Sequence, residues 1–432
     1  LIFLGALLVS GITTFFGWKL LLKIYPQYHD ILHGFTYNGH DYIGAFVFLS
    51  LAISLLFYSH SNSENKIENY SIAPLFIWIL INFAIAFYLP GAGFIIIPLF
   101  FSLFMLAYFV TTQKTQPILN LILSIPSLII LVPFITMFPI GLGLKILTGS
   151  AVLTVLVFGL LLPIFGSFPR KGFWALLLLL ISIGFFIKAS FNSGYAVGTA
   201  KPNSLLYVLD ADVKKSYWTT YDMNLDEWTK GYLGDNPKNA ETLNTNKLYS
   251  KYGSQFTFMN DAPNKNIATP TIEFLRDTLK GNQRLYQIKI TPNRAVNRYD
   301  IFNANEAKLH NLVANGAKAI DFKSNISGSN SGKILSYYVV NNEPLVLSFS
   351  IAKEDKLDLN LVESSFDLLT NPQFTVTKRK DWMISTPFVL NNAIIIRQKI
   401  KPTPVLEDNP KPQLYRRNVA SRDSLSVRND SL

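Results

Sequence analysis

The chain has 432 residues, of which 49% are hydrophobic and only 16% charged, and its mean hydropathy is positive. This balance is unusual for a protein that is soluble throughout, since soluble domains carry about 25% charged residues on average. The absence of cysteine excludes disulfide frameworks and thiolate metal sites. The net charge of +11 does not indicate a nucleic-acid partner, because much of it lies beside apolar segments and in the C-terminal tail.

Charged residues are concentrated in the second half of the chain. Only eight of the 39 Lys and Arg residues, and four of the 28 Asp and Glu residues, precede Lys201. We therefore predict a membrane domain in residues 1–190 and a water-exposed domain in residues 201–400. The sequence opens with Leu1 inside an apolar run, so we expect a fragment of a longer protein; a signal peptide is neither predicted nor excluded.

Seven apolar segments predict a helical bundle of about seven membrane spans, with the lipid bilayer as partner. A helix needs about 20 apolar residues to cross about 30 Å of hydrocarbon, and the shorter segments gain length from uncharged flanks. The segments are Leu1–Leu22, Tyr42–Tyr58, Ile72–Leu89, Phe94–Thr111, Ile118–Met137, Leu147–Phe165 and Gly172–Ile187.

The basic residues of the connecting loops predict the orientation of these spans. With seven spans, Lys66, Lys114 and the Arg170–Lys171 pair share one side of the membrane with the N-terminus. The opposite side has only Lys23 and Lys145 near its short loops. Because Lys and Arg are enriched in cytoplasmic loops, the C-terminal domain is predicted to be extracytoplasmic, either periplasmic or lumenal.

The region after Ser204 predicts a mainly-β, sandwich-like soluble domain. Short strands recur between Gly-, Asn- and Pro-rich turns, which is typical of antiparallel sandwiches. One short helix is predicted at Thr269–Lys280, and residues 401–432 have too few apolar residues to fold, which predicts a disordered tail. The predicted strands are Leu205–Leu209, Ser216–Tyr221, Leu285–Ile290, Tyr299–Ala304, Ile334–Val340, Leu345–Ile351, Leu357–Val362 and Phe388–Gln398.

The sharpest local pattern for metal chemistry is His29-Asp30-Ile31-Leu32-His33. Two histidines at i and i+4 share one face of a helix, which is the spacing of zinc-binding helices, and an acid follows the first histidine. The zinc-protease version has a Glu in place of this Asp, and a third ligand is not evident. His29, Asp30 and His33 are therefore weak metal candidates, and the alternative is an interfacial loop between two spans.

A second pattern, Asp210-Ala211-Asp212, imitates the paired acids with which membrane glycosyltransferases hold a metal and a sugar phosphate. It lies between two predicted strands, where Asp is a common turn former. Trp218, Trp228 and Tyr232 could stack on a sugar, and core packing explains them equally well. The spans contain no obvious acid at mid-membrane, which disfavours a transporter or proton pump.

The sequence from Pro202 onward resembles the C-terminal part of membrane-anchored zinc metallopeptidases of family 28, the Fxna-like or vacuolar membrane protease group. The resemblance covers nearly the whole chain, but its motifs are loose and none of them is catalytic. They are PNSLLYVLDADVKKSYWTTYD with Leu225-Asp226-Glu227-Trp228, LHNLVANGAKAIDF (Leu309–Phe322), ILSYYVVNNEPLVLSFSI (Ile334–Ile351) and LDLNLVESSFDLL (Leu357–Leu369).

This resemblance implies an exopeptidase whose di-zinc catalytic domain lies upstream of Leu1, so the zinc and the peptide substrates would be held there. No histidine of this chain matches the family's ligands, so no catalytic residue and no cofactor are expected in this segment. It would serve as a membrane anchor and accessory part, with the upstream peptidase domain as partner. The alternative is a self-contained multi-pass protein with a carbohydrate-binding or glycosyltransferase-like domain that uses Asp210 and Asp212.

Overall fold

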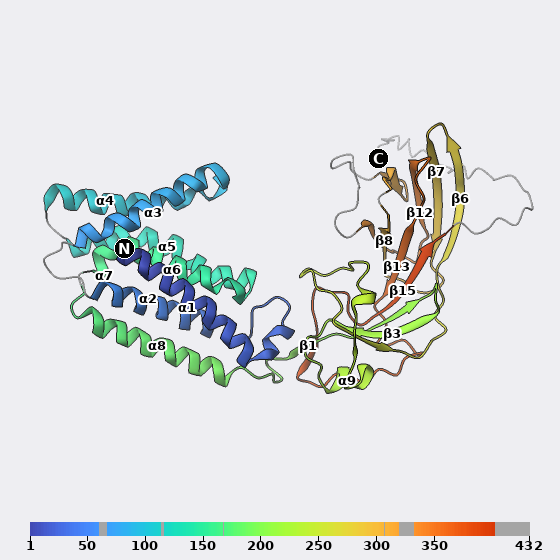
Figure 1. Ribbon diagram of the computed structural model, residues 1–432, viewed down its shortest axis with the longest axis horizontal. Helices are drawn as coiled ribbons and strands as arrows, with labels where there is room; N and C mark the ends of the chain where they lie inside the picture. Colours follow the sequence, from blue (N-terminus) through green and yellow to red (C-terminus); the bar gives the residue numbers. More distant parts are fainter. Residues whose placement is uncertain (60–66, 114–115, 167, 306, 319–331, 402–432) are drawn as a thin grey trace, which may run out of the picture. The chain divides into compact units, whose positions relative to one another are not determined.

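The computed structural model describes residues 1–59, 67–113, 116–166, 168–305, 307–318 and 332–401 (Figure 1). The predicted tail therefore lies outside the described residues, apart from Lys401. The chain divides into two compact units. The first unit comprises Leu1–Tyr207, Tyr217–Asp261 and Asp367–Ala393, and the second comprises Val208–Ser216, Ala262–Phe366 and the residues from Ile394 onward. The first unit thus combines the apolar helices with part of the β region.

Within the described residues, six helices are long and apolar enough to cross a membrane. The chain is thus a multi-pass membrane protein by the length and composition of its helices. Short 3-10 helices lie in its connections: η1 (Pro26–Asp30), η2 (Pro90–Ile95) and η3 (Leu144–Ile146). The six helices are α1 (Ile2–Ile24), α2 (Gly39–Ser59), α3 (Ile67–Tyr88), α4 (Ile96–Thr112, extended by η2), α5 (Pro117–Leu142) and α8 (Lys171–Phe191).

The sixth predicted span is shorter than expected. It folds as α6 (Leu147–Leu160) and a single turn, α7 (Leu162–Phe165). With η3 directly before it, α6 forms one apolar helix, Leu144–Leu160, which is shorter than the six spanning helices. The 14 residues of α6 alone rise about 21 Å, less than the roughly 30 Å of a hydrocarbon core. Where about seven spans are predicted, the described residues thus contain six helices of spanning length and one shorter apolar helix. Pro163, whose ring cannot continue a regular helix, explains the break.

Helix α6 packs inside the helical bundle, and nine of its 14 residues are buried. At its start, Leu147 packs in one cluster with Tyr42, near the beginning of α2. At its end, Phe158 packs with Tyr58, near the end of α2. Helix α6 therefore runs beside α2 from one end of the bundle to the other, and it also contacts α1 and α5 (Figure 1).

Three chain connections meet at one end of the bundle, which we call the bundle end. The backbone N–H of Leu144 donates to the carbonyl oxygen of Gly34 at 2.7 Å, which joins the α5–α6 connection to the α1–α2 loop. Asn38 Nδ2 donates to the carbonyl oxygen of Ala189 at 2.7 Å, which joins the same loop to the end of α8. Gly143 has φ +83°, and a Cβ there would lie 2.5 Å from a backbone oxygen, so only glycine fits this approach.

The β region of the first unit begins directly after α8. Strand β1 (Lys201–Asn203) pairs in parallel with β14 (Met383–Ser385), and β5 (Phe258–Asp261) pairs antiparallel with both β3 (Lys215–Thr220) and β4 (Lys238–Asn239). Helix α9 (Glu227–Leu233) and the 3-10 helix η4 (Glu241–Leu243) complete it. The boundary between the two units falls within β3 and within β2 (Leu206–Asp210).

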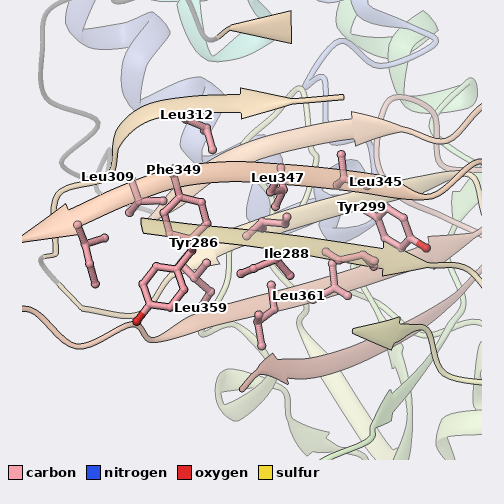
Figure 2. Packing of buried hydrophobic residues seen from close by; sticks show 14 of the residues in the cluster. Tyr286, Ile288, Tyr299, Leu309, Leu312, Leu345, Leu347, Phe349, Leu359 and Leu361 are labelled. Carbon is pink, nitrogen blue, oxygen red and sulfur yellow. The ribbon is translucent and has the colours of Figure 1, made fainter. Parts of the chain in front are cut away.

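The second unit consists of antiparallel strands that share one apolar core. One sheet has the order β10-β9-β12-β7-β6, and the strands β11, β8, β13 and β15 are neighbours in another. Alternate residues of β7, β8, β12 and β13 point into the shared core, as the period of two in a strand requires (Figure 2). The strands are β6 (Thr271–Lys280), β7 (Gln283–Thr291), β8 (Arg298–Asn303), β9 (His310–Ala314), β10 (Ala317–Lys318), β11 (Lys333–Tyr338), β12 (Leu345–Ala352), β13 (Leu359–Ser365) and β15 (Ala393–Ile400).

All eight predicted strands are confirmed, with ends shifted by a few residues. The helix predicted at Thr269–Lys280 is wrong, because this segment forms β6 and pairs along its length with β7. A β-bulge between Phe274 and Arg276 explains the error, since it breaks the alternation of apolar and polar residues. Ile272 and Phe274 pack against the core, whereas Leu275 and Leu279 are exposed.

Candidate functional site

The two histidines predicted to share a helix face do not lie on a common α-helix. His29 and Asp30 are in the 3-10 helix η1, which ends at Asp30, and His33 follows it in a turn. The ring of His33 packs edge-on against Tyr252, with centroids 6.2 Å apart. Within the described residues, no group of three or more His, Cys, Asp or Glu side chains is placed to hold a metal ion. Metal binding by these residues remains a prediction.

The carboxylates of Asp210 and Asp212 both accept hydrogen bonds from backbone N–H groups. The Oδ1 atom of Asp210 accepts hydrogen bonds from the backbone N–H groups of Asp212 at 3.1 Å and Val213 at 3.2 Å. Oδ2 of Asp212 accepts from the backbone N–H of Lys399 at 2.8 Å. The bonds of Asp210 are those of an Asx-type turn, in which the carboxylate satisfies nearby backbone donors, whereas the bond of Asp212 reaches a residue distant in the sequence.

The aromatic residues considered for sugar stacking are packed together instead. Trp218 is buried, as its place on a covered strand predicts, and its ring contacts those of Tyr207 and Phe374. Trp228 is also buried, and its indole N–H donates to the carbonyl oxygen of Thr377 at 2.8 Å. A ring surrounded by other side chains cannot stack on a ligand, so this arrangement is that of a core.

The chemically richest site of the first unit forms where Asp30 meets the beginning of the β region. We call it the junction cluster. Its members are polar side chains from the α1–α2 loop, β1, the segment before α9 and the loop before β14: Asp30, Lys201, Asn203, Asp222, Asn224, Asp226 and Arg379. It joins the bundle end to the β region within one compact unit.

The ammonium group of Lys201 is the centre of the junction cluster. It donates to the backbone oxygen of Asn224 at 2.6 Å, and it lies 3.4 Å from Oδ2 of Asp226 and 3.7 Å from Oδ2 of Asp30. The side chain of Lys201 is only 8% exposed, and both carboxylates are buried. A buried charge is tolerated when it is paired and hydrogen-bonded, and Lys201 satisfies both conditions.

Asp226 is held as an anion by its place at the start of α9. Its Oδ1 accepts from the backbone N–H groups of Trp228 and Thr229. The hydroxyl of Thr229 accepts in turn from the backbone N–H of Asp226, which completes a capping box. Oδ2 accepts from Asn203 Nδ2 at 2.9 Å. Burial opposes ionisation, but the hydrogen bonds from Asn203 and Thr229 and the charge of Lys201 outweigh it. The pKa of Asp226 therefore lies below its ordinary value.

Asp30 and Asp222 are shifted in the opposite direction. Burial raises the pKa of Asp222 to about 7, against the lowering effect of the Ser204 hydroxyl, which donates to its Oδ1 at 2.7 Å. Burial also raises the pKa of Asp30, although Lys201 and Asn224 favour its anion. Asn224 donates to Oδ1 of Asp30 from its backbone N–H at 3.0 Å and from its side chain at 3.2 Å.

Arg379 supplies the second cation of the cluster. Its Nε donates to Oδ1 of Asn203 at 2.5 Å, its Nη2 donates to Asn392, and its guanidinium lies 4.1 Å from the centre of the Trp228 ring. Burial lowers the pKa of Arg379 to about 10, so it stays charged at neutral pH. Near pH 7 the cluster can bind or release a proton at Asp222.

Most members of the junction cluster could not be predicted from the sequence. The sequence indicated Asp30 only as a metal candidate, whereas in the structure Asp30 is ion-paired with Lys201 and hydrogen-bonded to Asn224. A local signal existed for Asp226, because Asp followed by a short apolar-periodic segment is typical of a helix N-cap. Comparisons of the chain with protein-family models, with curated proteins and with solved structures find no match.

Proposed function

We propose that this chain is the membrane-anchoring and accessory part of a zinc-dependent exopeptidase whose catalytic domain lies upstream of Leu1. The observation that carries the anchoring role is the junction cluster. There the buried Lys201, at the first position of the β region, is ion-paired with Asp30 from the loop between two membrane helices. An anchor must hold its extramembrane part in place, and a buried ion network with directional hydrogen bonds does so. The assignment to exopeptidases depends on the sequence resemblance.

We also propose that all seven apolar segments cross the membrane, with the β region on the extracytoplasmic side. The α1–α2 loop, the start of α6 and the end of α8 meet at the bundle end. That convergence supports a crossing by α6 as well as by α8, and burial by its neighbours explains how a short helix can do so. Lys188 also lies at the bundle end, and basic residues are enriched on the cytoplasmic side of a membrane. Because its ammonium group is ion-paired with Asp41 at 2.7 Å, Lys188 is weaker evidence for a cytoplasmic location of this end.

We propose further that the core shared by the strands of the second unit makes this unit a sandwich. Its strands contribute alternate apolar residues to one cluster from more than one sheet, and this supports the assignment.

The test of the exopeptidase role compares two proteins. One is this chain, and the other is this chain together with the coding sequence that precedes it in its gene. Both are purified in detergent and offered aminoacyl-fluorophore substrates with zinc and with a chelator. Zinc-dependent turnover by the longer protein alone supports the proposal. Turnover by the chain alone that is lost in His29→Ala or His33→Ala contradicts it, and so does inactivity of both proteins.

A further inference from the structure

Two loops of the first unit are paired at one point of the β region. The backbone N–H of Lys251 donates to the carbonyl oxygen of Phe388 at 2.9 Å, and the N–H of Leu390 donates to that of Tyr249 at 3.1 Å. An isolated β-bridge between Ser250 and Val389 lies between these bonds. The pairing gathers three aromatic residues and one lysine, which we call the aromatic tip: Tyr249, Lys251, Tyr252 and Phe388.

Phe388 is presented to the outside rather than buried. Its side chain is 56% exposed, and its backbone has φ +57°, a left-handed conformation that is unfavourable for a bulky residue. The ring of Tyr252 packs edge-on against it with centroids 6.4 Å apart, and Nζ of Lys251 lies 4.9 Å from its centre. An exposed aromatic ring held by a strained backbone and flanked by a cation is a feature that folding alone does not require.

The aromatic tip lies beside the bundle end. Tyr252 packs against His33, which belongs to the loop between α1 and α2. The next residue, Gly34, accepts the hydrogen bond from Leu144 at the start of α6. Exposed aromatic side chains of the helical part, Tyr37 and Phe191, flank the same end. The tip is therefore continuous with the zone in which the membrane helices leave the hydrocarbon.

We propose that the aromatic tip inserts into the lipid headgroup layer of the membrane that the helices span. Tyr249 and Tyr252 are of the kind enriched at membrane–water interfaces, because a tyrosine ring is apolar and its hydroxyl is hydrated. The exposed ring of Phe388 is wholly apolar and is stabilised by leaving water. The ammonium group of Lys251 favours anionic phospholipids, since a basic residue near a negatively charged surface is attracted to it. The occupant of this surface is thus the bilayer itself, and the tip holds the β region against it.

The test uses the full chain in lipid nanodiscs, and the absence of cysteine makes every introduced thiol unique. A fluorophore is attached in the variant F388C, and its quenching is measured with a lipid-borne quencher and with aqueous iodide. L8C, at a 64% exposed position of α1, is the lipid-exposed reference, and D235C, at a side chain that is 86% exposed, is the water-exposed reference. We expect the label at position 388 to be at least threefold more sensitive to the lipid quencher than the label at position 235.

A second comparison tests the role of the lysine. The substitution Lys251→Glu in the labelled F388C protein is expected to reduce lipid quenching in anionic nanodiscs and to leave it unchanged in zwitterionic ones. If position 388 is as accessible to iodide as position 235 in both lipids, the inference is wrong and the tip faces water or a protein partner. If position 8 also fails to contact lipid, the membrane assignment of the helices fails as well, so the two outcomes are distinct.

Discussion

Removing the cation at position 201 is the most direct perturbation of the junction cluster. Lys201→Met keeps the length and apolar stem of the side chain but leaves Asp30 and Asp226 without their shared partner. Unit charges about 4 Å apart attract by about 4 kcal/mol at an effective dielectric constant of about 20. Both ion pairs are shorter than that, at 3.4 Å and 3.7 Å, and both are buried. Breaking one partner of a buried pair costs about 3–5 kcal/mol, which is the loss we expect.

The backbone N–H of Asn224 reports on this loss directly, because it donates to the carboxylate of Asp30. Hydrogen exchange of the full chain in nanodiscs, read by mass spectrometry, measures the free energy of opening at that amide. A loss of about 3 kcal/mol accelerates exchange more than a hundredfold, since each 1.4 kcal/mol is a factor of ten. Peptides that cover the α1–α2 loop should show the same acceleration if the cluster holds the two parts together.

Two control variants make the result decisive. Lys201→Arg retains the charge and is expected to lose much less protection. Lys230→Met removes a surface ion pair with Asp235, 3.6 Å long and largely exposed, and should cost less than about 1 kcal/mol. The reasoning is refuted if Lys201→Met changes the exchange of Asn224 by no more than Lys230→Met does.

Three further predictions concern pH, packing and topology. Because the pKa of Asp222 is raised to about 7 in the fold, the stability that its protonated form contributes is complete below about pH 4 and is lost as pH rises through 7. Asp222→Asn should abolish this pH dependence, measured as hydrogen-exchange rates corrected for intrinsic pH effects. An unchanged pH dependence in this variant would contradict the assignment. Trp218→Ala should lower the free energy of unfolding in denaturant by about 3–5 kcal/mol, and Asp212→Asn should lower it by less than about 1 kcal/mol. An unchanged free energy of unfolding in Trp218→Ala would argue against core packing. A reporter that is active only in the cytoplasm, fused after Ile400, should be silent, and activity there would overturn the proposed orientation.

The features that the sequence predicted well are those that depend on neighbouring residues. Apolar runs near 20 residues predicted the membrane helices, and alternation bounded by Asn, Gly and Pro predicted eight strands, because both signals are local. Strand β6 was wrongly predicted as a helix, because the bulge after Phe274 breaks the alternation and makes the apolar spacing look helical. A local signal for the strand existed as well, because only two residues, Gly281 and Asn282, separate β6 from β7, and such a turn is typical of a β-hairpin. The strands β1, β4, β5, β9, β10 and β14 were not predicted either.

The junction cluster could not be predicted in the same way, because its contacts join distant parts of the chain. Asn224 and Asp30 are separated by 194 residues, and Arg379 and Asn203 by 176. No local spacing encodes such a pair, and a single sequence does not show which residues vary together. The sequence offered Asp30 only as the middle of a histidine pattern, whose geometry depended on an α-helix that does not form there.

The burial of α6 has a consequence for how this protein is made. The apolar helix Leu144–Leu160, formed by η3 and α6, is at the short end of the range of about 17–25 residues that crosses a bilayer, whereas its packing partners α1, α2 and α5 are longer. All three precede α6 in the chain, so they are synthesised first and can already form the groove that receives it. Insertion of α6 is then a step of tertiary assembly. Substitutions on α1 or α2 that spoil this groove would disturb the insertion of α6 rather than that of the helix that carries them.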